Sequence, residues 1–430
     1  MHENIRYITA QDYEQEVLRG GNVVLDFYST ECPPCEALAA KFEPLSEVYG
    51  KDIAFLKIFR QENRELALSL GVSSSPQLLF YRNGVPVGEK LVGSIRRSDI
   101  VRNLELLLPP GRSAVLRSAV RPVETACDLL VIGGGPAGLT AAIYAAQAKV
   151  KTIVVDKDLP GGQVKVTHLV SNYPGFHEPV SGYMLMHEMA EQAKGAGVAF
   201  RSAVDITAMD LLRKNIVVDG FETITAKKII LATGSSPRPL GVKGEREYKG
   251  QGISYCSTCD AKFYEGKDVV VIGGGNSAIE ESLFITRFAR SVTIVHQFAA
   301  LQANKAAQEK AFANPRIRFI FEHEPREFVK EGTSVRRVVI EDLRTHALET
   351  LACDGVFIFA GMKPNIEEFA SLFRLDEFGY IETDAAMHTS VDDIFAIGDV
   401  ASKRFRQITT AVADGTIAAI TASRELEAAR

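Results

Sequence analysis

The chain has 430 residues, enough for about three domains of the usual size. Hydrophobic residues make up 46% of it and charged residues 24%, a balance typical of globular proteins and too apolar for a disordered chain. The formal net charge of −5 argues against a broad basic surface, so we expect no nucleic-acid partner.

The sequence predicts no targeting or membrane segment. Residues 1–15 are polar, unlike a signal peptide. The uncharged stretch from Leu129 to Ala148 is long enough for a membrane span, but the glycines and the proline at its centre would break a spanning helix. We therefore expect a cytoplasmic protein without a membrane partner.

The N-terminal quarter is expected to form one small α/β domain. Two β-rich runs, Val23–Tyr28 and Ile53–Phe59, flank a helical pattern of apolar residues. A third run, Gln77–Tyr81, is followed by Asn83-Gly84, the strongest short signal for a β-hairpin. Ile100–Leu108 predicts a closing helix.

A C-x-x-C motif, Cys32-Pro33-Pro34-Cys35, lies between the first strand and its helix. A sulfur at a helix N-terminus has a lowered pKa, so Cys32 would attack a target disulfide and Cys35 would resolve the mixed disulfide. Asp26, in the apolar strand before it, would be buried and could accept the proton of Cys35. Half a zinc site or a structural disulfide is the alternative. We expect no metal, because no second Cys/His pair follows in this segment.

Five features of this segment fall in one order: Asp26-Phe27, the C-x-x-C, Ser75-Pro76, Asn83-Gly84 and Gly93. In these the segment resembles thioredoxin, which implies disulfide exchange and a cis-proline loop at Pro76. It departs from that pattern at Pro33-Pro34, usually Gly-Pro, and at Glu31, usually tryptophan. A carboxylate at Glu31 would oppose formation of the thiolate and so affect redox potential and the choice of target.

Residues 109–124 hold three prolines and three arginines without a clear hydrophobic period. We expect them to form a linker long enough to let the small domain swing.

The rest of the chain contains a near repeat. Leu129–Gly138 resembles Val269–Ala278, and each combines an apolar run, a glycine turn and an apolar helix. Further β-rich runs follow at Thr152–Val155 and Val292–Val295. Two such βαβ units predict two dinucleotide-binding domains.

The first glycine turn is Gly133-x-Gly135-x-x-Gly138. Its glycines allow a tight turn and a close approach to a pyrophosphate at the helix N-terminus. Asp156, at the end of the next strand, is placed to bond ribose hydroxyls. A glycine turn that serves only packing is the alternative.

A second dithiol motif, Cys256-Ser257-Thr258-Cys259-Asp260, precedes the second glycine turn. A dithiol beside a flavin domain offers two-electron transfer from flavin to sulfur, and Asp260 could shuttle the proton. A chance pair in a loop is the alternative. The remaining cysteines, Cys127 and Cys353, lie in or beside apolar strands and are expected to be inert.

Eight motifs follow one another from residue 133 onward: Gly133–Gly138, Gly161–Gln163, Ser171–Gly175, Ala232–Gly234, Tyr255–Asp260, Gly273–Glu281, Gly398–Val400 and Arg406-Gln407. In their order and spacing this part of the chain resembles low-molecular-weight thioredoxin reductase. The resemblance implies that Cys259 exchanges electrons with FAD, that Cys256 attacks the thioredoxin disulfide, and that the chain forms a homodimer. The FAD-binding residues that we expect are Gly133, Gly135, Pro136, Ala137, Gly138, Asp156, Gly162, Gln163, Asn172, Gly398, Asp399, Arg406 and Gln407.

The expected donor site departs from that family. Where the family has His-Arg-Arg-x-x-x-Arg for the 2′-phosphate of NADPH, this chain has His296 followed by Gln297, Phe298 and, later, Gln302. Charge-assisted bonds contribute about 1.5–3 kcal/mol each, so losing two weakens binding by roughly 100-fold or more. We therefore favour NADH over NADPH, with reduced ferredoxin as an alternative donor. A nicotinamide nucleotide would lie on Gly273, Gly275, Asn276, Ser277 and Ala278.

We expect an α/β protein made of a thioredoxin fold followed by two Rossmann-like domains, the FAD domain being discontinuous. The predicted boundaries are 1–108 for the thioredoxin-like domain, 109–124 for the linker, 125–241 with 365–430 for the FAD domain, and 242–364 for the NAD(P)-binding-like domain.

The predicted activity is that of an FAD-dependent thioredoxin-disulfide reductase. Electrons would pass from a donor through FAD and Cys256/Cys259 to Cys32/Cys35, within one chain or across a dimer, and then to protein disulfides, a peroxiredoxin or free thioredoxin. A flavoprotein of the alkyl hydroperoxide reductase type also joins a thioredoxin-like N-terminus to this core, but its double fold needs more residues than are present here. The non-enzymatic alternative is a flavin-binding redox sensor, against which two intact dithiols argue.

Overall fold

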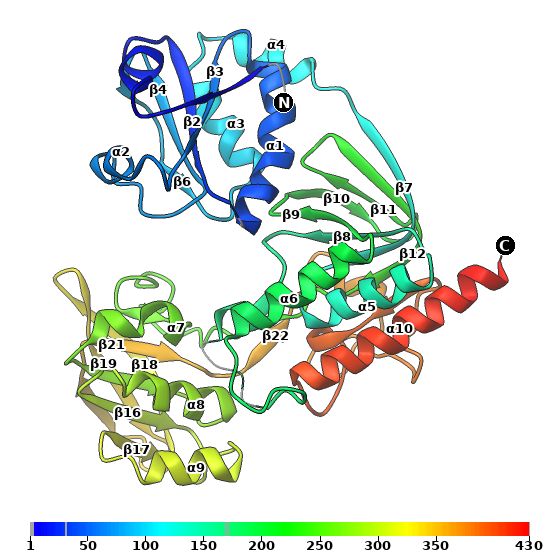
Figure 1. The fold of residues 1–430 in the computed structure, drawn as a ribbon. Helices are drawn as coiled ribbons and strands as arrows, with labels where there is room; N and C mark the ends of the chain where they lie inside the picture. Colours follow the sequence, from blue (N-terminus) through cyan, green and yellow to red (C-terminus); the bar gives the residue numbers. More distant parts are fainter. Residues whose placement is uncertain (1–3, 31, 168–169, 171, 430) are drawn as a thin grey trace.

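The computed structural model describes residues 4–30, 32–167, 170 and 172–429, apart from the side chain of Cys259. It contains one thioredoxin-like unit and two nucleotide-binding-like units (Figure 1). Among the described residues, none of the helices combines the length and hydrophobicity needed to cross a bilayer.

The thioredoxin-like unit is a mixed sheet in the order β1-β3-β2-β4-β5, with β6 also on β4. Phe42 of the first long helix packs edge-on against Phe55 of the sheet in the core between them. The predicted hairpin is confirmed: Asn83 and Gly84, with φ of 50° and 77°, form the two-residue turn between β4 and β5. The elements are β1 (Ile5–Ile8), a helical turn (Glu14–Leu18), β2 (Asn22–Tyr28), α1 (Pro33–Tyr49), β3 (Ala54–Phe59), α2 (Arg64–Ser69), β4 (Gln77–Arg82), β5 (Val85–Pro86), β6 (Leu91–Val92) and α3 (Arg97–Leu106).

The segment expected to be an irregular linker contains a helix, α4 (Arg112–Ser118). Leu116 is buried in the core of the thioredoxin-like unit, and Arg112 forms an ion pair with Asp52 at 2.7 Å. These two residues hold the segment to this unit. The sequence did not predict the helix, because seven residues are too few to show a clear hydrophobic period. The connection without helix or strand narrows to residues 119–122.

The first nucleotide-binding-like unit has the strand order β10-β11-β12-β7-β8-β9, and β23 pairs with the end of β12 on the edge opposite β7. The C-terminal helix packs on α5 at Gly415, where an added Cβ would lie 2.4 Å from the carbonyl oxygen of Ala137. The return of β23 and this helix makes the unit discontinuous. Its elements are β7 (Val123–Ile132), α5 (Pro136–Gln147), β8 (Thr152–Asp156), a helical turn (Gly162–Val166), α6 (Gly182–Gly195), β9 (Ala199–Ser202), β10 (Ile206–Asp210), β11 (Asn215–Val218), β12 (Glu222–Leu231), β23 (Ile394–Ala396), a helical turn (Gly398–Val400) and α10 (Ile408–Ala428).

The second unit is a parallel sheet in the order β14-β21-β15-β16-β17, beside an antiparallel sheet of β18, β19 and β20. The two chain crossovers between the units pair with each other as β13 (Ser235–Pro237) and β22 (Met362–Pro364). The other elements of the second unit are β14 (Ile253–Ser254), α7 (Ser257–Asp260), a helical turn (Ala261–Tyr264), β15 (Asp268–Ile272), α8 (Asn276–Ile285), β16 (Ser291–His296), α9 (Lys305–Phe312), β17 (Ile317–Phe321), β18 (His323–Glu331), β19 (Ser334–Asp342), β20 (Leu348–Ala352) and β21 (Gly355–Ile358). A helical turn after the second crossover (Ala370–Leu372) packs against the core of the first unit.

Candidate functional site

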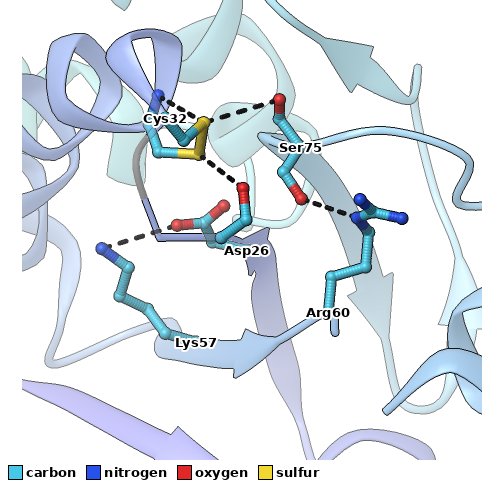
Figure 2. The surroundings of a disulfide bond; sticks show 7 residues. Asp26, Cys32, Lys57, Arg60 and Ser75 are labelled. Atoms are coloured by element: carbon cyan, nitrogen blue, oxygen red, sulfur yellow. Dashed lines mark hydrogen bonds and ion pairs between the residues drawn. A yellow bond between two sulfur atoms is a disulfide. The ribbon is translucent and has the colours of Figure 1, made fainter. Parts of the chain in front are cut away.

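The first dithiol lies at the start of α1, where Cys32 is the N-cap residue and is bonded to Cys35 as a disulfide. The Cys32 sulfur accepts the backbone N–H of Cys35 at 3.2 Å and lies 3.7 Å from the carbonyl oxygen of Ser75 (Figure 2). The peptide bond between Ser75 and Pro76 is cis. The dithiol and the proline loop therefore meet at one point, while Glu31 lies outside the described residues.

Asp26 lies beneath this disulfide in β2 and is 1% exposed. Burial raises its pKa to about 6, partly offset by the Lys57 ammonium 3.5 Å from Oδ2. Among the described residues, its Oδ1 has no hydrogen-bond partner. A buried carboxyl with a pKa near neutrality can hold or release a proton during thiol chemistry.

A first cavity of about 750 Å³ lies at the carboxyl end of the first nucleotide-binding-like sheet. Gly133 has φ of 108° and Gly138 lies so close to it that an added Cβ would meet the Gly133 carbonyl oxygen at 2.0 Å. Gly135 caps α5 without a side chain, so the first N–H groups of the helix are open to the cavity. Eleven residues that were expected to hold FAD line it: Gly133, Gly135, Pro136, Ala137, Asp156, Gly162, Gln163, Gly398, Asp399, Arg406 and Gln407.

The polar groups around this cavity fit a dinucleotide. The carboxylate of Asp156 accepts the N–H groups of Gly134 at 2.6 Å and Asp158 at 2.8 Å, and its burial raises its pKa. The buried Thr233 Oγ1 and Arg406 Nε have no hydrogen-bond partner among the described residues, so both can serve a polar ligand. Asn172 donates from Nδ2 to Gln407 Oε1 at 3.2 Å, although neither it nor Gly138 lines the cavity; Ser171 lies outside the described residues.

A second cavity of about 850 Å³ contains Cys256 and the second glycine turn, and shares Gln163, Asp399, Arg406 and Gln407 with the first. Cys256 is disulfide-bonded, and its backbone N–H donates to Ser254 Oγ at 3.0 Å. The nucleotide-turn residues expected from the sequence all line it: Gly273, Gly275, Asn276, Ser277 and Ala278. Asp260 follows at the end of α7 and is not among the residues lining this cavity.

Residues 296–302, where the resembling family carries its arginines, border the same cavity through Gln297 and Gln302. Phe298 is exposed, and its ring packs edge-on against the ring of His296. Burial lowers the pKa of His296 and thereby favours the neutral form of its ring. Arg326 of β18 also lines the cavity, but carboxylates of Glu324 and Glu341 already pair with it at 2.8 and 2.5 Å. Beside the substituted segment, the cation Arg326 is therefore already paired, whereas Arg238 and Arg406 line other parts of the cavity.

Two carboxylates next to the second dithiol, the half-buried Glu281 and the buried Glu245, were not found by sequence reasoning. Ser257 donates a hydrogen bond to Glu281 of α8, whose pKa is raised by burial. Glu245, 4% exposed, accepts the N–H of Gly241 at 2.7 Å and the hydroxyl of Tyr255 at 2.5 Å. It thereby joins the crossover between the two units to the residue before Cys256. No sequence motif predicts either contact, because each joins segments that are distant in the sequence and meet only in the folded chain.

The structure keeps the two dithiols apart. Cys32 and Cys35 contact residues of their own unit, while Cys256 borders the cavity between the other two units. Cys127 and Cys353 are free and buried, and burial raises their pKa values to about 11 and about 12, which makes both thiols unreactive.

Comparisons with known proteins agree with this arrangement. Residues 127–415 match the family model described as pyridine nucleotide-disulphide oxidoreductase, and residues 4–105 match that of thioredoxin. The chain is 44% identical over 315 residues to a thioredoxin reductase of Peptoclostridium acidaminophilum (71% of this chain, 99% of the relative) and 41% identical over 296 residues to that of Bacillus subtilis (69% and 93%).

A third relative, a 34.2 kDa protein in the rubredoxin operon of Clostridium pasteurianum, is 42% identical over 302 residues (70% and 97%). Among solved structures, the thioredoxin reductase of Lactococcus lactis in its FR conformation matches with a TM-score of 0.67 at 40% identity (70% and 99%). That of T. acidophilum matches with 0.66 at 34% identity (70% and 98%).

Proposed function

Because the chain belongs to the pyridine nucleotide-disulphide oxidoreductase family and carries a thioredoxin domain as well, we propose that it reduces its own thioredoxin domain. The observation that carries this proposal is the presence of two separate disulfide-bonded cysteine motifs, one in a thioredoxin site and one beside a nucleotide cavity. The product would be a dithiol at Cys32/Cys35 that reduces external protein disulfides.

Residues of the first cavity fit FAD, which supplies two-electron exchange with the second dithiol when bound. The N-terminus of α5 would accept the pyrophosphate, and Asp156 would accept hydrogen bonds from ribose hydroxyls. Arg406 and Gln407 extend from this cavity into the second one, so they would line the path toward Cys256.

The relay itself is two thiol-disulfide exchanges. The Cys256 thiolate attacks the Cys32 sulfur, the Cys32–Cys35 bond breaks, and Cys35 leaves with its electron pair. The Cys259 thiolate then attacks the Cys256 sulfur and releases Cys32 as a thiolate. Asp26 would provide the proton that Cys35 takes up, and Asp260 would exchange protons at the second dithiol.

We propose NADH as the donor. Gln297 and Gln302 carry no charge, and Arg326 is already paired with two carboxylates, so a 2′-phosphate would gain few charge-assisted bonds. Reduced ferredoxin is the alternative, because no carboxylate that would grip an NADH ribose ends β16, where His296 stands instead. Anaerobic titration of the flavoprotein with NADH, NADPH and reduced ferredoxin decides the matter: bleaching by ferredoxin alone would contradict the proposal.

The remaining proposals concern partners and location. A homodimer follows from the family resemblance, with protein disulfides, a peroxiredoxin or free thioredoxin as clients. A cytoplasmic site is supported by the sparse cysteine content of the sequence.

The order of the relay is tested by Cys32→Ser. We expect this variant to keep donor-dependent flavin reduction and to lose the turnover of insulin-type disulfides, because the thioredoxin nucleophile is missing. Cys127→Ser is the control, since that cysteine is buried away from both dithiols. Turnover of protein disulfides by Cys32→Ser at the parent rate would show that the electrons leave from Cys256 directly.

A further inference from the structure

The thioredoxin domain is seated on the FAD domain through a small polar surface. We call this surface the dock and define it by Asp158, Lys194, Ser202, Asp205, Asp219 and Phe221. Figure 1 shows α1 of the thioredoxin domain beside the sheet that contains β9 and β10. The helix α7, which directly follows Cys256, belongs to the other nucleotide-binding unit. The contacts come from α1 and from the segment that begins α3.

Lys41 is the most buried charged contact of the dock. Lys41 is 5% exposed, and its ammonium donates to the carbonyl oxygens of Ala37 at 3.0 Å and Ile95 at 3.1 Å in its own domain, and to that of Ser202 of β9 at 2.9 Å. Burial lowers its pKa to about 8, and the carboxylates of Asp219 and Asp205 oppose that shift. A cation so enclosed depends on the FAD domain for one of its three partners.

The start of α3 supplies a second set of contacts. Arg96 and Ser98 donate to the carboxylate of Asp205 at 3.3 and 2.5 Å. Arg97, 7% exposed, lies over the ring of Phe221 at 4.8 Å from its centre. Cations of the thioredoxin domain therefore face carboxylates of the FAD domain, an arrangement with electrostatic complementarity.

The dock extends to the neighbourhood of the disulfide. Glu36, the residue after Cys35, pairs with Lys194 of α6 at 2.8 Å, and Ser94 hydrogen-bonds to Asp158. Both contacts flank the end of the domain at which Cys32 lies, and Cys32 itself is 8% exposed. A partner disulfide or a second dithiol would have to approach this same end.

We propose that the dock is a resting position, which the thioredoxin domain must leave before Cys256 can reduce Cys32–Cys35. This inference rests on the proposed relay, because Cys256 is its electron source. The contacts are polar and charged, as in domain interfaces that open and close. Residues 119–122 form the only connection without helix or strand between α4 and β7, so they are the segment about which the domain would turn.

The test separates the dock from the relay by using charge reversal with rescue. Full-length, FAD-loaded protein is prepared as parent, as Asp205→Lys, as Arg96→Glu and as the double variant. Asp210→Lys is the matched control, because Asp210 lies on the same β10 strand and pairs only with its neighbour Arg213 among the contacts described. Small-angle X-ray scattering gives the radius of gyration of each oxidised protein. Stoichiometric dithionite, followed by timed alkylation and mass spectrometry, gives the rate at which Cys32 and Cys35 become thiols.

Either single reversal is expected to enlarge the radius of gyration and to accelerate thiol formation, by up to roughly 10-fold for the loss of one charge-assisted bond. The double variant should return to the parent values, and Asp210→Lys should not differ from the parent. High salt should act on the parent like the single reversals, because it screens the dock.

Three results would overturn the inference. Slower thiol formation in an enlarged Asp205→Lys protein would make the dock the productive position rather than a resting one. An unchanged radius of gyration in both single variants would mean that the contacts do not hold the domain. If Cys32 and Cys35 did not become reduced in the parent, the proposed relay would be refuted, and the resting role of the dock with it. The scattering data would still show whether the contacts of the dock hold the domain in place.

Discussion

Single residues set the chemistry at both dithiols. In β2, Asp26 is buried with Lys57 as its counter-ion, and the pKa of about 6 follows from that burial. In the second cavity, uncharged Gln297 and Gln302 stand where the resemblance calls for arginines. Each of these positions therefore yields a prediction that one substitution can test.

Replacing Asp26 with asparagine should stabilise the thioredoxin domain above pH 6. The folded pKa of about 6 lies above the unfolded value of about 3.9, so the ionised carboxyl destabilises the fold. In the parent, the free energy of unfolding falls as the pH rises from about 4 through 6, by about 3 kcal/mol at most. Hydrogen exchange of β2 amides, corrected for intrinsic rates, measures this fall. The same pH dependence in Asp26→Asn would contradict the assignment.

Restoring cations in the second cavity should restore affinity for NADPH. Gln297→Arg with Gln302→Arg would return two charge-assisted bonds to a 2′-phosphate, worth roughly 100-fold in the dissociation constant of NADPH. That of NADH should change much less, because it has no phosphate there. Equilibrium titration gives both constants. Gln192→Arg, on an exposed position of α6, is the charge control, and equal gains for both nucleotides would contradict the site.

At the scale of elements, the helix α4 shortens the flexible connection between the thioredoxin domain and the FAD domain. Its buried Leu116 and its ion pair from Arg112 to Asp52 join it to the thioredoxin domain. The domain that moves would therefore be residues 4–118, and the free connection is short. A short tether keeps the released domain close to the reductase and makes the encounter of the dithiols intramolecular.

Leu116→Ala is expected to detach α4. Removing a buried leucine side chain costs about 2–5 kcal/mol, more than a seven-residue helix can supply by itself. The substitution should therefore expose residues 109–122 to limited proteolysis without unfolding the nucleotide-binding units. Val115→Ala is the matched control, because Val115 is exposed on the same helix. Equal cleavage of the two variants would show that Leu116 does not anchor the segment.

At the scale of the whole molecule, two cavities in series and a docked thioredoxin domain favour a relay within one chain. The cavities share Gln163, Asp399, Arg406 and Gln407, so the two candidate nucleotide sites and the second dithiol are contiguous. The thioredoxin domain is tethered to the same FAD domain on which it docks. Its local concentration at Cys256 can reach the millimolar range.

Mixing two inactive variants tests this view. We expect Cys32→Ser and Cys256→Ser chains, combined after separate purification, to remain inactive in disulfide reduction at about 1 μM, far below the effective concentration of the tethered domain. The measurement is insulin-type disulfide turnover with a reduced donor. Coexpressed chains, which can form mixed dimers, are the accompanying sample. Recovery in that sample alone would place the relay across a dimer interface.

Local sequence by itself determined much of this protein. The apolar runs, the Asn83-Gly84 turn and the two glycine turns predicted strands, hairpin and βαβ units, because these depend on side-chain period and on backbone conformations of neighbouring residues. The motifs also pointed to both dithiols, to the cis-proline loop and to eleven of the residues that line the first cavity.

Only the tertiary structure decided the contacts between distant segments. The burial of Leu116, the bridge from Glu245 to Tyr255, the pairing of Arg326 and the seating of Lys41 on Ser202 each join residues far apart in the chain. The local sequence does not show whether a lysine or glutamate is buried, because its burial and its partner are set by the packing of whole units. For the same reason the sequence predicted a mobile thioredoxin domain but not the surface of the FAD domain that it contacts.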